Sequence, residues 1–132
     1  MGHIRNSCLT CLALLLLIAG CTASDPKLAP VSGRVTLDGQ PLESADVLFQ
    51  PDDSKSPSYG RTDKDGHYDL GYKRGVAGAM VGQHTVRITV SPELVPNPPR
   101  LLPRFNTQSD LHCDVKPGQN TFDFEVTADP QK

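Results

Sequence analysis

Apolar side chains recur at every second position along most of the chain from Val31 onward, and this spacing constrains the fold more than any other feature. Successive residues of a β-strand point to opposite faces of a sheet, so a period of two marks strands that bury one face. In residues 85–90, for example, Val86, Ile88 and Val90 alternate with threonine and arginine. Turn residues separate these segments at intervals of about 8 to 12 residues. We therefore expect an all-β sandwich or barrel.

Turn residues also predict how some of these strands connect. Asp38-Gly39 can adopt the positive φ angles of a two-residue hairpin turn. Residues 63–66 (DKDG) predict a second hairpin between the two segments that flank them. The expected strands cover residues 31–37, 45–50, 58–62, 67–72, 85–90, 111–115 and 122–126.

The N-terminal segment has the features of an export signal. A polar start with one charge, Arg5, precedes an unbroken apolar stretch over residues 12–19 and then small residues. Counted generously, from Cys8 to Ala19, the apolar run has 12 residues, whereas about 20 are needed to span a bilayer. A cleaved signal is therefore favoured over a permanent transmembrane helix.

Residues 17–21, Leu-Ile-Ala-Gly-Cys, resemble the lipobox of bacterial lipoproteins. Small residues at 19 and 20 give a peptidase access to the bond before Cys21, whose thiolate is a strong nucleophile that can take a diacylglycerol. Two acyl chains anchor a protein stably, whereas one chain gives only marginal binding. We expect residues 1–20 to be a signal peptide cleaved between Gly20 and Cys21, and Cys21 to carry the lipid. The alternative is an ordinary secretory signal with an incidental cysteine.

Residues 21–30 are predicted to tether the domain to the membrane, because they contain two prolines and no apolar period. Such a tether holds the domain within about 30 Å of the lipid. Thr22 stands where many Gram-negative lipoproteins carry a retention signal such as Asp, so by resemblance we expect the outer membrane, facing the periplasm or the surface. The domain itself is expected over residues 31–127, with a short tail over 128–132.

The use of cysteine agrees with this interpretation. Cys8 and Cys11 would leave with the signal and Cys21 would be acylated, which leaves Cys113 without a partner. We therefore expect no disulfide framework and no zinc site within the chain. Cys8 and Cys11 form a C-x-x-C pattern, but inside an apolar signal segment we interpret it as incidental.

Composition and charge exclude one large class of function. The chain has 13 basic and 15 acidic side chains, a net charge of -2, four Phe, three Tyr and no Trp. It lacks the basic, aromatic surface of nucleic-acid-binding proteins, so we expect no nucleic-acid partner. Its 12 Pro and 11 Gly are many, yet the regular apolar spacing favours a folded, turn-rich domain over a disordered chain.

Three motifs resemble those of carboxypeptidase regulatory-like domains. Residues 33–47 (GRVTLDGQPLESADV) resemble the opening strand and turn of that family, residues 62–68 (TDKDGHY) its T-D-x-x-G-x-Y hairpin, and residues 82–86 (GQHTV) its G-x-Y-x-V strand entry. Together with Cys21, the pattern is similar to that of small bacterial lipoproteins that carry one such module. The resemblance implies a seven-stranded, transthyretin-like (prealbumin-like) Greek-key sandwich that accompanies enzymes, adhesins or transporters and has no catalytic residues of its own. His84 departs from the family's motif, which has an aromatic residue there.

The clustered carboxylates have a simpler interpretation than metal binding. Asp63, Asp65 and Gly66 could form half of a calcium loop, but the further ligands of an EF-hand are missing. A β-turn in which Asp bonds the local backbone explains the same residues, and we favour it. We assign no metal site and no cofactor.

The histidines and the remaining cysteine are also expected to be structural. By strand parity His67 and His112 point outward, whereas His84 shares a face with the core and is expected to replace a core aromatic residue. Cys113 is interpreted as a small core hydrophobe. No spacing typical of a catalytic nucleophile and base is present, so we assign no catalytic residue.

Residues 91–106 form the remaining candidate site, a long loop with five prolines that carries Arg100 and Arg104. Long loops in compact domains are often functional, and arginine is enriched at interfaces, so these two arginines are candidate partner contacts. The simpler interpretation is a covering loop between the sheets. The sequence thus predicts a lipid-anchored cell-envelope protein that acts as a non-catalytic binding or scaffolding module for an envelope protein or glycan. The alternatives are a carrier for a small ligand such as a sugar and, less favoured, a small hydrolase.

Overall fold

Strands β4 (Ala45–Pro51) and β8 (Gly82–Val90) form the middle of a four-stranded antiparallel sheet in the computed structural model, which describes residues 27–130. β5 (Ser58–Arg61) pairs with the free edge of β4, and β9 (Leu111–Val115) pairs with the free edge of β8. The strand order is therefore β5-β4-β8-β9.

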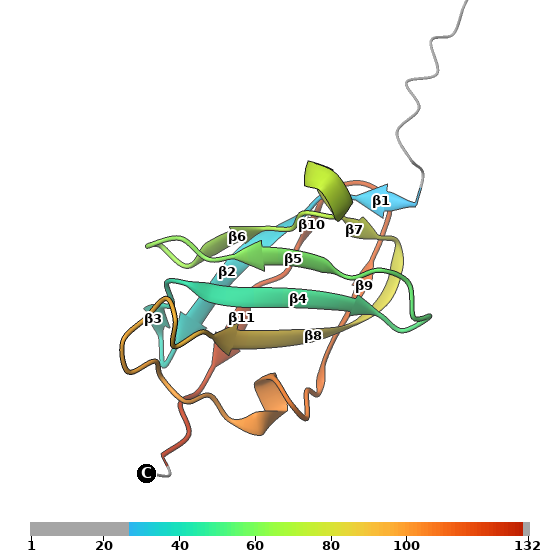
Figure 1. Ribbon diagram of the computed structural model, residues 1–132. Helices are drawn as coiled ribbons and strands as arrows, with labels where there is room; N and C mark the ends of the chain where they lie inside the picture. Colours follow the sequence, from blue (N-terminus) through green and yellow to red (C-terminus); the bar gives the residue numbers. More distant parts are fainter. Residues whose placement is uncertain (1–26, 131–132) are drawn as a thin grey trace, which may run out of the picture.

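A second sheet is built around β2 (Val31–Leu37). β3 (Gln40–Pro41) and β6 (His67–Asp69) pair antiparallel with β2, whereas β10 (Asn120–Thr121) and β11 (Phe124–Val126) pair parallel with it. Figure 1 shows β4, β5 and β8 in front of β2 and β11, so the two sheets lie in separate layers. The all-β prediction is confirmed.

The remaining elements are short. β1 (Leu28–Ala29) pairs with β7 (Ala79–Met80), and the chain forms two 3₁₀ turns, η1 (Lys73–Gly75) and η2 (Pro103–Phe105). Neither helical turn in residues 27–130 has the length and apolar character that crossing a bilayer requires. The described residues form eleven strand segments, so the seven-stranded Greek-key count stays a prediction.

The core lies between the two sheets and contains the residues that the alternation predicts. Val47 and Phe49 of β4 and Val86 and Ile88 of β8 are all fully buried. Phe49 joins the layers, because its ring centroid lies 5.9 to 6.5 Å from those of three aromatic residues of the β2 sheet. These residues are Tyr68, Phe122 and Phe124.

The first predicted turn is confirmed, but it joins β2 to the short β3, and the next predicted strand, β4, lies in the other sheet. Asp38 and Gly39 connect β2 to β3, with φ angles of 49° and 84°. Both central residues of such a two-residue turn need positive φ, which glycine and aspartate tolerate better than most residues.

The second predicted hairpin is present in part: its segments pair at the turn, where Asp63 N–H donates a 2.9 Å hydrogen bond to the His67 carbonyl, and at residues 59 and 71, but between these points they join different sheets. β5 pairs with β4 and β6 pairs with β2, so residues 62–66 cross from one layer to the other. A bridge between Tyr59 and Gly71, with backbone hydrogen bonds of 2.8 and 3.0 Å, still holds the two segments together. Thr62 directs the crossing, because its Oγ1 accepts a 2.9 Å hydrogen bond from Ala45 N–H and its own N–H donates to the Ala45 carbonyl. The end of β5 is thereby tied to β4.

The packed region extends beyond the predicted domain limits at both ends. Residues 21–30 are predicted to be a tether, yet Leu28 and Ala29 form β1 and Ala29 is buried. At the other end, Ala128 of the predicted tail forms a bridge with Leu101. The packed domain therefore begins before residue 31 and ends after residue 127. Short stretches without an apolar period can still pair with a distant segment.

Residues 1–26 and 131–132 lie outside the described residues. They include the predicted signal peptide, its cleavage site at Gly20 and the predicted lipid site at Cys21. These assignments therefore stay predictions.

At Gly33, β2, β6 and the segment between β10 and β11 are held together. Tyr68 of β6 lies opposite Gly33 of β2, and its hydroxyl donates a 2.6 Å hydrogen bond to the Phe122 carbonyl on the far side of β2. A Cβ at position 33 would lie 1.8 Å from that carbonyl oxygen and 2.9 Å from the Tyr68 hydroxyl, so only glycine fits. Burial raises the pKa of Tyr68 well above its ordinary value, and the hydroxyl therefore remains a donor.

The same contact explains why the last strand is divided. The Phe122 carbonyl bonds to Tyr68, and the N–H of Arg34 is instead bound by the side chain of Asp123, whose Oδ1 accepts it at 2.9 Å. β10 ends before this point and β11 begins after it. Val126 of β11 is buried and Asp123 is exposed, as the alternation predicts.

Replacing Gly33 with alanine should destabilise the fold by about 3 kcal/mol or more, because the new methyl group meets a backbone carbonyl that cannot move without separating β2 from its neighbour. Gly39→Ala is the matched control: nothing lies within 4 Å of its Cβ, so only the positive φ opposes the change. Its expected cost is about 1 kcal/mol. Urea unfolding of the two variants measures the difference, and equal costs would contradict the close approach at Gly33.

Candidate functional site

An open hollow of about 570 Å³ lies on the outer face of the four-stranded sheet. Strand alternation places its side chains, since the neighbours of inward-facing residues on β4, β5 and β8 point outward. Leu48 of β4 lies directly opposite Tyr59 of β5 on one side and Arg87 of β8 on the other. The lining residues are Asp46, Leu48, Tyr59, Gly60, Arg61, Arg87 and Thr89.

The floor of this hollow is apolar and one wall is aromatic. Leu48 is half-buried, and Tyr59 is 59% exposed, the largest exposed fraction among the exposed large hydrophobic residues of the described chain. A tyrosine ring held on a rigid sheet offers contact area to a ligand at low entropic cost, because it has only two side-chain torsions. This face is therefore suited to stack on a flat or apolar part of a ligand.

The rim of the hollow is charged. Arg61 Nε donates a 2.7 Å hydrogen bond to Asp46 Oδ1, and this carboxylate raises the pKa of Arg61 above its ordinary value. Arg87 has no hydrogen-bond or ion-pair partner among residues 27–130, although its side chain is only partly exposed. Two arginines against one aspartate leave the rim with an excess of positive charge, which favours a ligand with a polar or anionic group beside an apolar one.

Sequence reasoning missed this site. The alternation of inward and outward positions along the strands could have indicated it. Leu48 and Tyr59 are an aliphatic and an aromatic residue at outward-facing positions, where the alternation predicts polar side chains. Only the pairing of β5 with β4 brings the two residues together, and the sequence predicted a different partner for β5.

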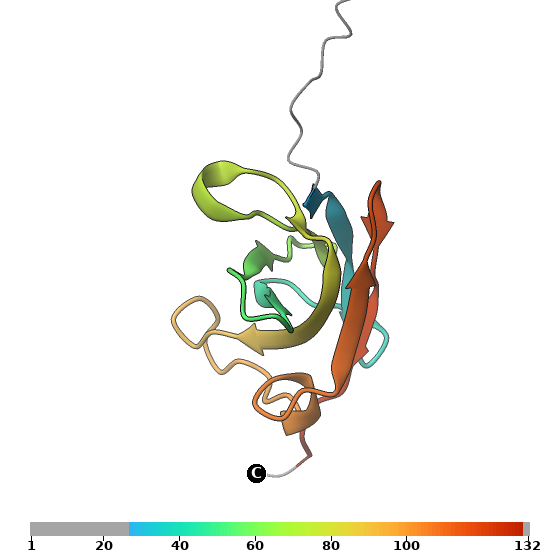
Figure 2. The ribbon, with the colours of Figure 1, turned by 90° about the vertical axis from the view of Figure 1, so that its right-hand side faces the viewer.

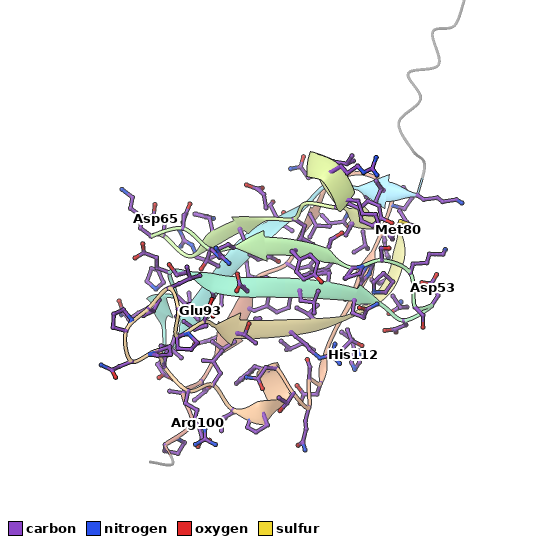
Figure 3. All side chains as sticks on the ribbon, viewed as in Figure 1. Asp53, Asp65, Met80, Glu93, Arg100 and His112 are labelled. Atoms are coloured by element: carbon purple, nitrogen blue, oxygen red, sulfur yellow. The ribbon has the colours of Figure 1, made fainter. Side chains whose placement is uncertain are left out.

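The predicted partner contacts, Arg100 and Arg104, lie on the loop over residues 91–106 at the opposite end of the sandwich from β1 (Figures 2 and 3). Both are exposed, but each has an acidic neighbour: Arg100 Nε lies 3.6 Å from Asp129 Oδ2, and Arg104 Nη2 lies 3.3 Å from Asp110 Oδ2. The structure does not bring the two arginines into one hollow, because Arg100 lines a groove of about 420 Å³ and Arg104 does not.

The same loop also covers the core. Leu101 and Phe105 are each 5% exposed and belong to the core cluster, and Arg104 lies over the Phe105 ring at 5.5 Å. The covering role is thus present, whereas the partner contact stays a prediction.

The predicted structural roles of His84 and Cys113 are confirmed. His84 is 1% exposed, its Nδ1 lies 3.0 Å from the Gly82 carbonyl, and its ring packs 5.7 Å from that of Phe49. Its Nε2 is buried without a hydrogen-bond partner. Cys113 is buried as well, and burial raises the pKa of its thiol to about 11. A thiol in this state is a poor nucleophile at neutral pH.

The turn at residues 63–66 is confirmed as a structural feature. Asp63 Oδ1 accepts hydrogen bonds from the N–H groups of Asp65 and His67, at 2.9 and 3.0 Å, and these bonds hold the pKa of Asp63 below its usual range. Gly66 has a φ of 79°, and a Cβ there would lie 2.5 Å from the Val35 carbonyl oxygen. Within residues 27–130, no three His, Cys, Asp or Glu side chains are grouped so that they could hold a metal ion.

A polar hollow of about 590 Å³ lies on the outer face of the other sheet, beside Ser32, His67 and Asp69. Both His67 and His112 are exposed, as predicted. His67 Nε2 lies 3.0 Å from Arg34 Nη2, so the ring nitrogen that a serine nucleophile would need faces a guanidinium group instead. This arrangement does not match a Ser-His-Asp triad.

His84→Phe should change the free energy of unfolding by no more than about 1 kcal/mol, because it keeps the ring contact with Phe49 and removes a buried, unpartnered nitrogen. His84→Ala should cost about 2 to 5 kcal/mol, because it leaves a cavity in the core. Urea unfolding distinguishes the two variants. A phenylalanine variant as unstable as the alanine variant would show that the imidazole nitrogens are needed.

Comparisons with known proteins add evidence on the fold. No protein-family model and no curated protein sequence matches the chain. A solved structure of a DUF3823 family protein from Parabacteroides merdae is similar, with a TM-score of 0.50 and 19% sequence identity. The match covers 79% of this chain and 48% of that chain, so this chain spans about half the length of its structural neighbour. At this identity the similarity shows a shared β-rich fold and nothing about activity.

Proposed function

We propose that this protein is a lipid-anchored component of a bacterial cell envelope whose β-sandwich binds a partner without catalysing a reaction. The observation that carries the binding role is the hollow beside Tyr59 and Arg87, an exposed ring and a guanidinium without an ion-pair partner on one rigid sheet face. Against catalysis stand the burial of Cys113 and His84 and the raised pKa of that thiol. A small hydrolase is therefore the least favoured alternative.

The envelope location is proposed from the sequence. The lipobox-like residues 17–21 and the three motifs that resemble carboxypeptidase regulatory-like domains support a lipoprotein with one such module. Thr22 after the lipidated Cys21 favours the outer membrane. The acyl chains would concentrate the domain near other molecules of the same membrane, so that a weak contact becomes effective.

Cys21 should be acylated and should be the first residue of the mature chain. Intact mass spectrometry of the protein from the membrane fraction tests both points, and Cys21→Ser should abolish lipid labelling and leave unprocessed precursor. Cys113→Ser is the matched control, which should leave lipid labelling unchanged because Cys113 is buried in the domain. A mature chain that begins elsewhere, or carries no lipid mass, would overturn the anchor.

Partner binding should depend on the hollow of the four-stranded sheet. The lipidated protein is used to capture partners from detergent-solubilised envelope membranes, and Tyr59→Ala combined with Arg87→Ala should weaken capture about tenfold or more. Arg100→Ala with Arg104→Ala tests the rival contact surface, the loop over residues 91–106, and leaves capture unchanged if the hollow is the binding site. Both double variants should keep the free energy of unfolding within about 0.5 kcal/mol of the parent.

If the Arg100 and Arg104 double variant loses capture and the Tyr59 and Arg87 double variant keeps it, the binding site is the loop over residues 91–106. Capture that survives in both double variants would show that neither the hollow nor the loop is the binding site. An exposed sheet edge, where a partner could add a strand, would then be the next candidate.

A carrier for a small ligand such as a sugar is the second candidate function. The exposed Tyr59 ring beside the hydrogen-bonding groups of Arg61 and Asp46 favours it, because a sugar presents an apolar face for stacking and hydroxyl groups for polar contacts. Titration of the same hollow variants with oligosaccharides distinguishes this role from protein binding.

A further inference from the structure

Residues 71–78 form a projecting loop that the proposed binding site does not use, called here the basic finger. Its two arms are joined by a bridge between Gly71 and Ala77 and by a 2.6 Å hydrogen bond from Tyr72 N–H to the Val76 carbonyl. At the tip, Arg74 and the following glycine have φ angles of 56° and 77°, which turn the chain back on itself. Every residue from 73 to 77 is exposed.

The base of the basic finger is packed against β1. A Cβ at Gly78 would lie only 2.5 Å from the Ala29 carbonyl oxygen, so the two backbones are in close contact. Just beyond the finger, Met80 pairs with Leu28, and Val81 N–H donates a 2.6 Å hydrogen bond to the Lys27 carbonyl. The finger therefore projects from the end of the sandwich at which the chain enters from its N-terminal segment, as Figures 1 and 2 show.

The chemistry of the finger is basic and apolar. Lys73 and Arg74 are exposed at the tip, and the stretch from Leu70 to Gln83 contains no aspartate or glutamate. Val76 is 48% exposed and Val81 is 36% exposed, and Lys73 Nζ lies 5.7 Å from the centre of the Tyr72 ring. Cations beside exposed aliphatic and aromatic groups are typical of surfaces that rest on lipid headgroups, because the cations meet phosphate and the apolar groups enter the boundary layer.

We propose that the basic finger contacts anionic lipid headgroups and holds the β1 end of the sandwich against the membrane. The choice of membrane rests on the proposed lipid anchor at Cys21. Lys27 follows Cys21 by six positions, and a fully extended chain of that length reaches about 20 Å. An acylated Cys21 therefore keeps the finger within reach of the headgroups.

This contact would orient the proposed binding site. β8 runs away from the finger for nine residues, a length of about 26 to 30 Å, and the 91–106 loop follows at its far end. With the β1 end on the membrane, it is the end of the sandwich that contacts the bilayer. The outer face of the four-stranded sheet makes no contact with the lipid. The hollow at Tyr59 stays open to a partner.

The test measures the depth of one fluorescent label in vesicles that carry the lipidated chain, in variants with Cys113→Ser so that the introduced cysteine is the one free thiol of residues 22–132. Val76→Cys places a label on the finger, and Leu94→Cys is the matched control, because Leu94 is also an exposed apolar residue, at 46%, but lies on the distant loop. Quenchers attached to the lipid acyl chains report contact with the bilayer. Vesicles of equal parts phosphatidylethanolamine and phosphatidylglycerol are compared with neutral phosphatidylcholine vesicles.

The expected result is quenching at position 76 that exceeds quenching at position 94 at least fivefold in anionic vesicles. Lys73→Glu with Arg74→Glu should reduce quenching at position 76 to the level at position 94, because each cation near an anionic surface contributes about a fivefold change in affinity. The charge-conserving pair Lys73→Arg with Arg74→Lys should keep the quenching. Added salt should weaken it, because the contact is electrostatic.

Three outcomes would overturn the proposal: equal quenching at the two positions, quenching that does not depend on anionic lipid, or quenching that survives charge reversal. If the label at position 76 is not quenched in anionic vesicles, the basic finger is exposed to water, and its partner is a protein and not lipid. Failure of the lipid anchor is seen separately, as the absence of lipid mass on Cys21.

Discussion

The hydrogen bond from the Tyr68 hydroxyl to the Phe122 carbonyl, made across Gly33, is the contact on which the β2 sheet depends. It joins β6, across β2, to the segment between β10 and β11, and it is possible only because position 33 carries no side chain. The Tyr68 ring then lies in the core beside Phe49, which belongs to the other sheet. A single buried polar group is thus satisfied, and the aromatic residues of both layers are placed around it.

This core explains why the chemistry of the molecule lies outside it. His84 and Cys113, whose side chains could take part in catalysis, are used to fill space between the sheets, and burial leaves the thiol with a raised pKa. The charged residues lie on sheet faces and loops, where some form ion pairs, as Arg61 does with Asp46. Arg87 is in no ion pair among the described residues, and it lines the same hollow as the exposed Tyr59 ring. These observations support the binding surface proposed above.

The two surfaces of interest lie on different parts of the fold, one on a sheet face and one at the β1 end of the sandwich, and have different chemistry. The hollow on the four-stranded sheet combines an apolar floor with arginines, which suits a ligand that has both apolar and polar parts. The basic finger has a compact charge at an end of the sandwich, which suits a broad anionic surface. If the first binds a partner and the second rests on lipid, the membrane contact leaves the partner site accessible.

Local patterns in the sequence determined which residues form strands, which face of β4 and β8 is buried, and where the turns at Asp38-Gly39 and Asp63 occur. These features depend on the pleat of a strand and on the φ angles of one or two residues, so neighbouring residues are enough to specify them. Only the tertiary structure decided that β5 pairs with β4, that β1 belongs to the packed domain, and that Leu48 lies between Tyr59 and Arg87. Strand pairing joins residues that are distant in the chain, and its free energy depends on how both layers close around the core, which no local pattern contains.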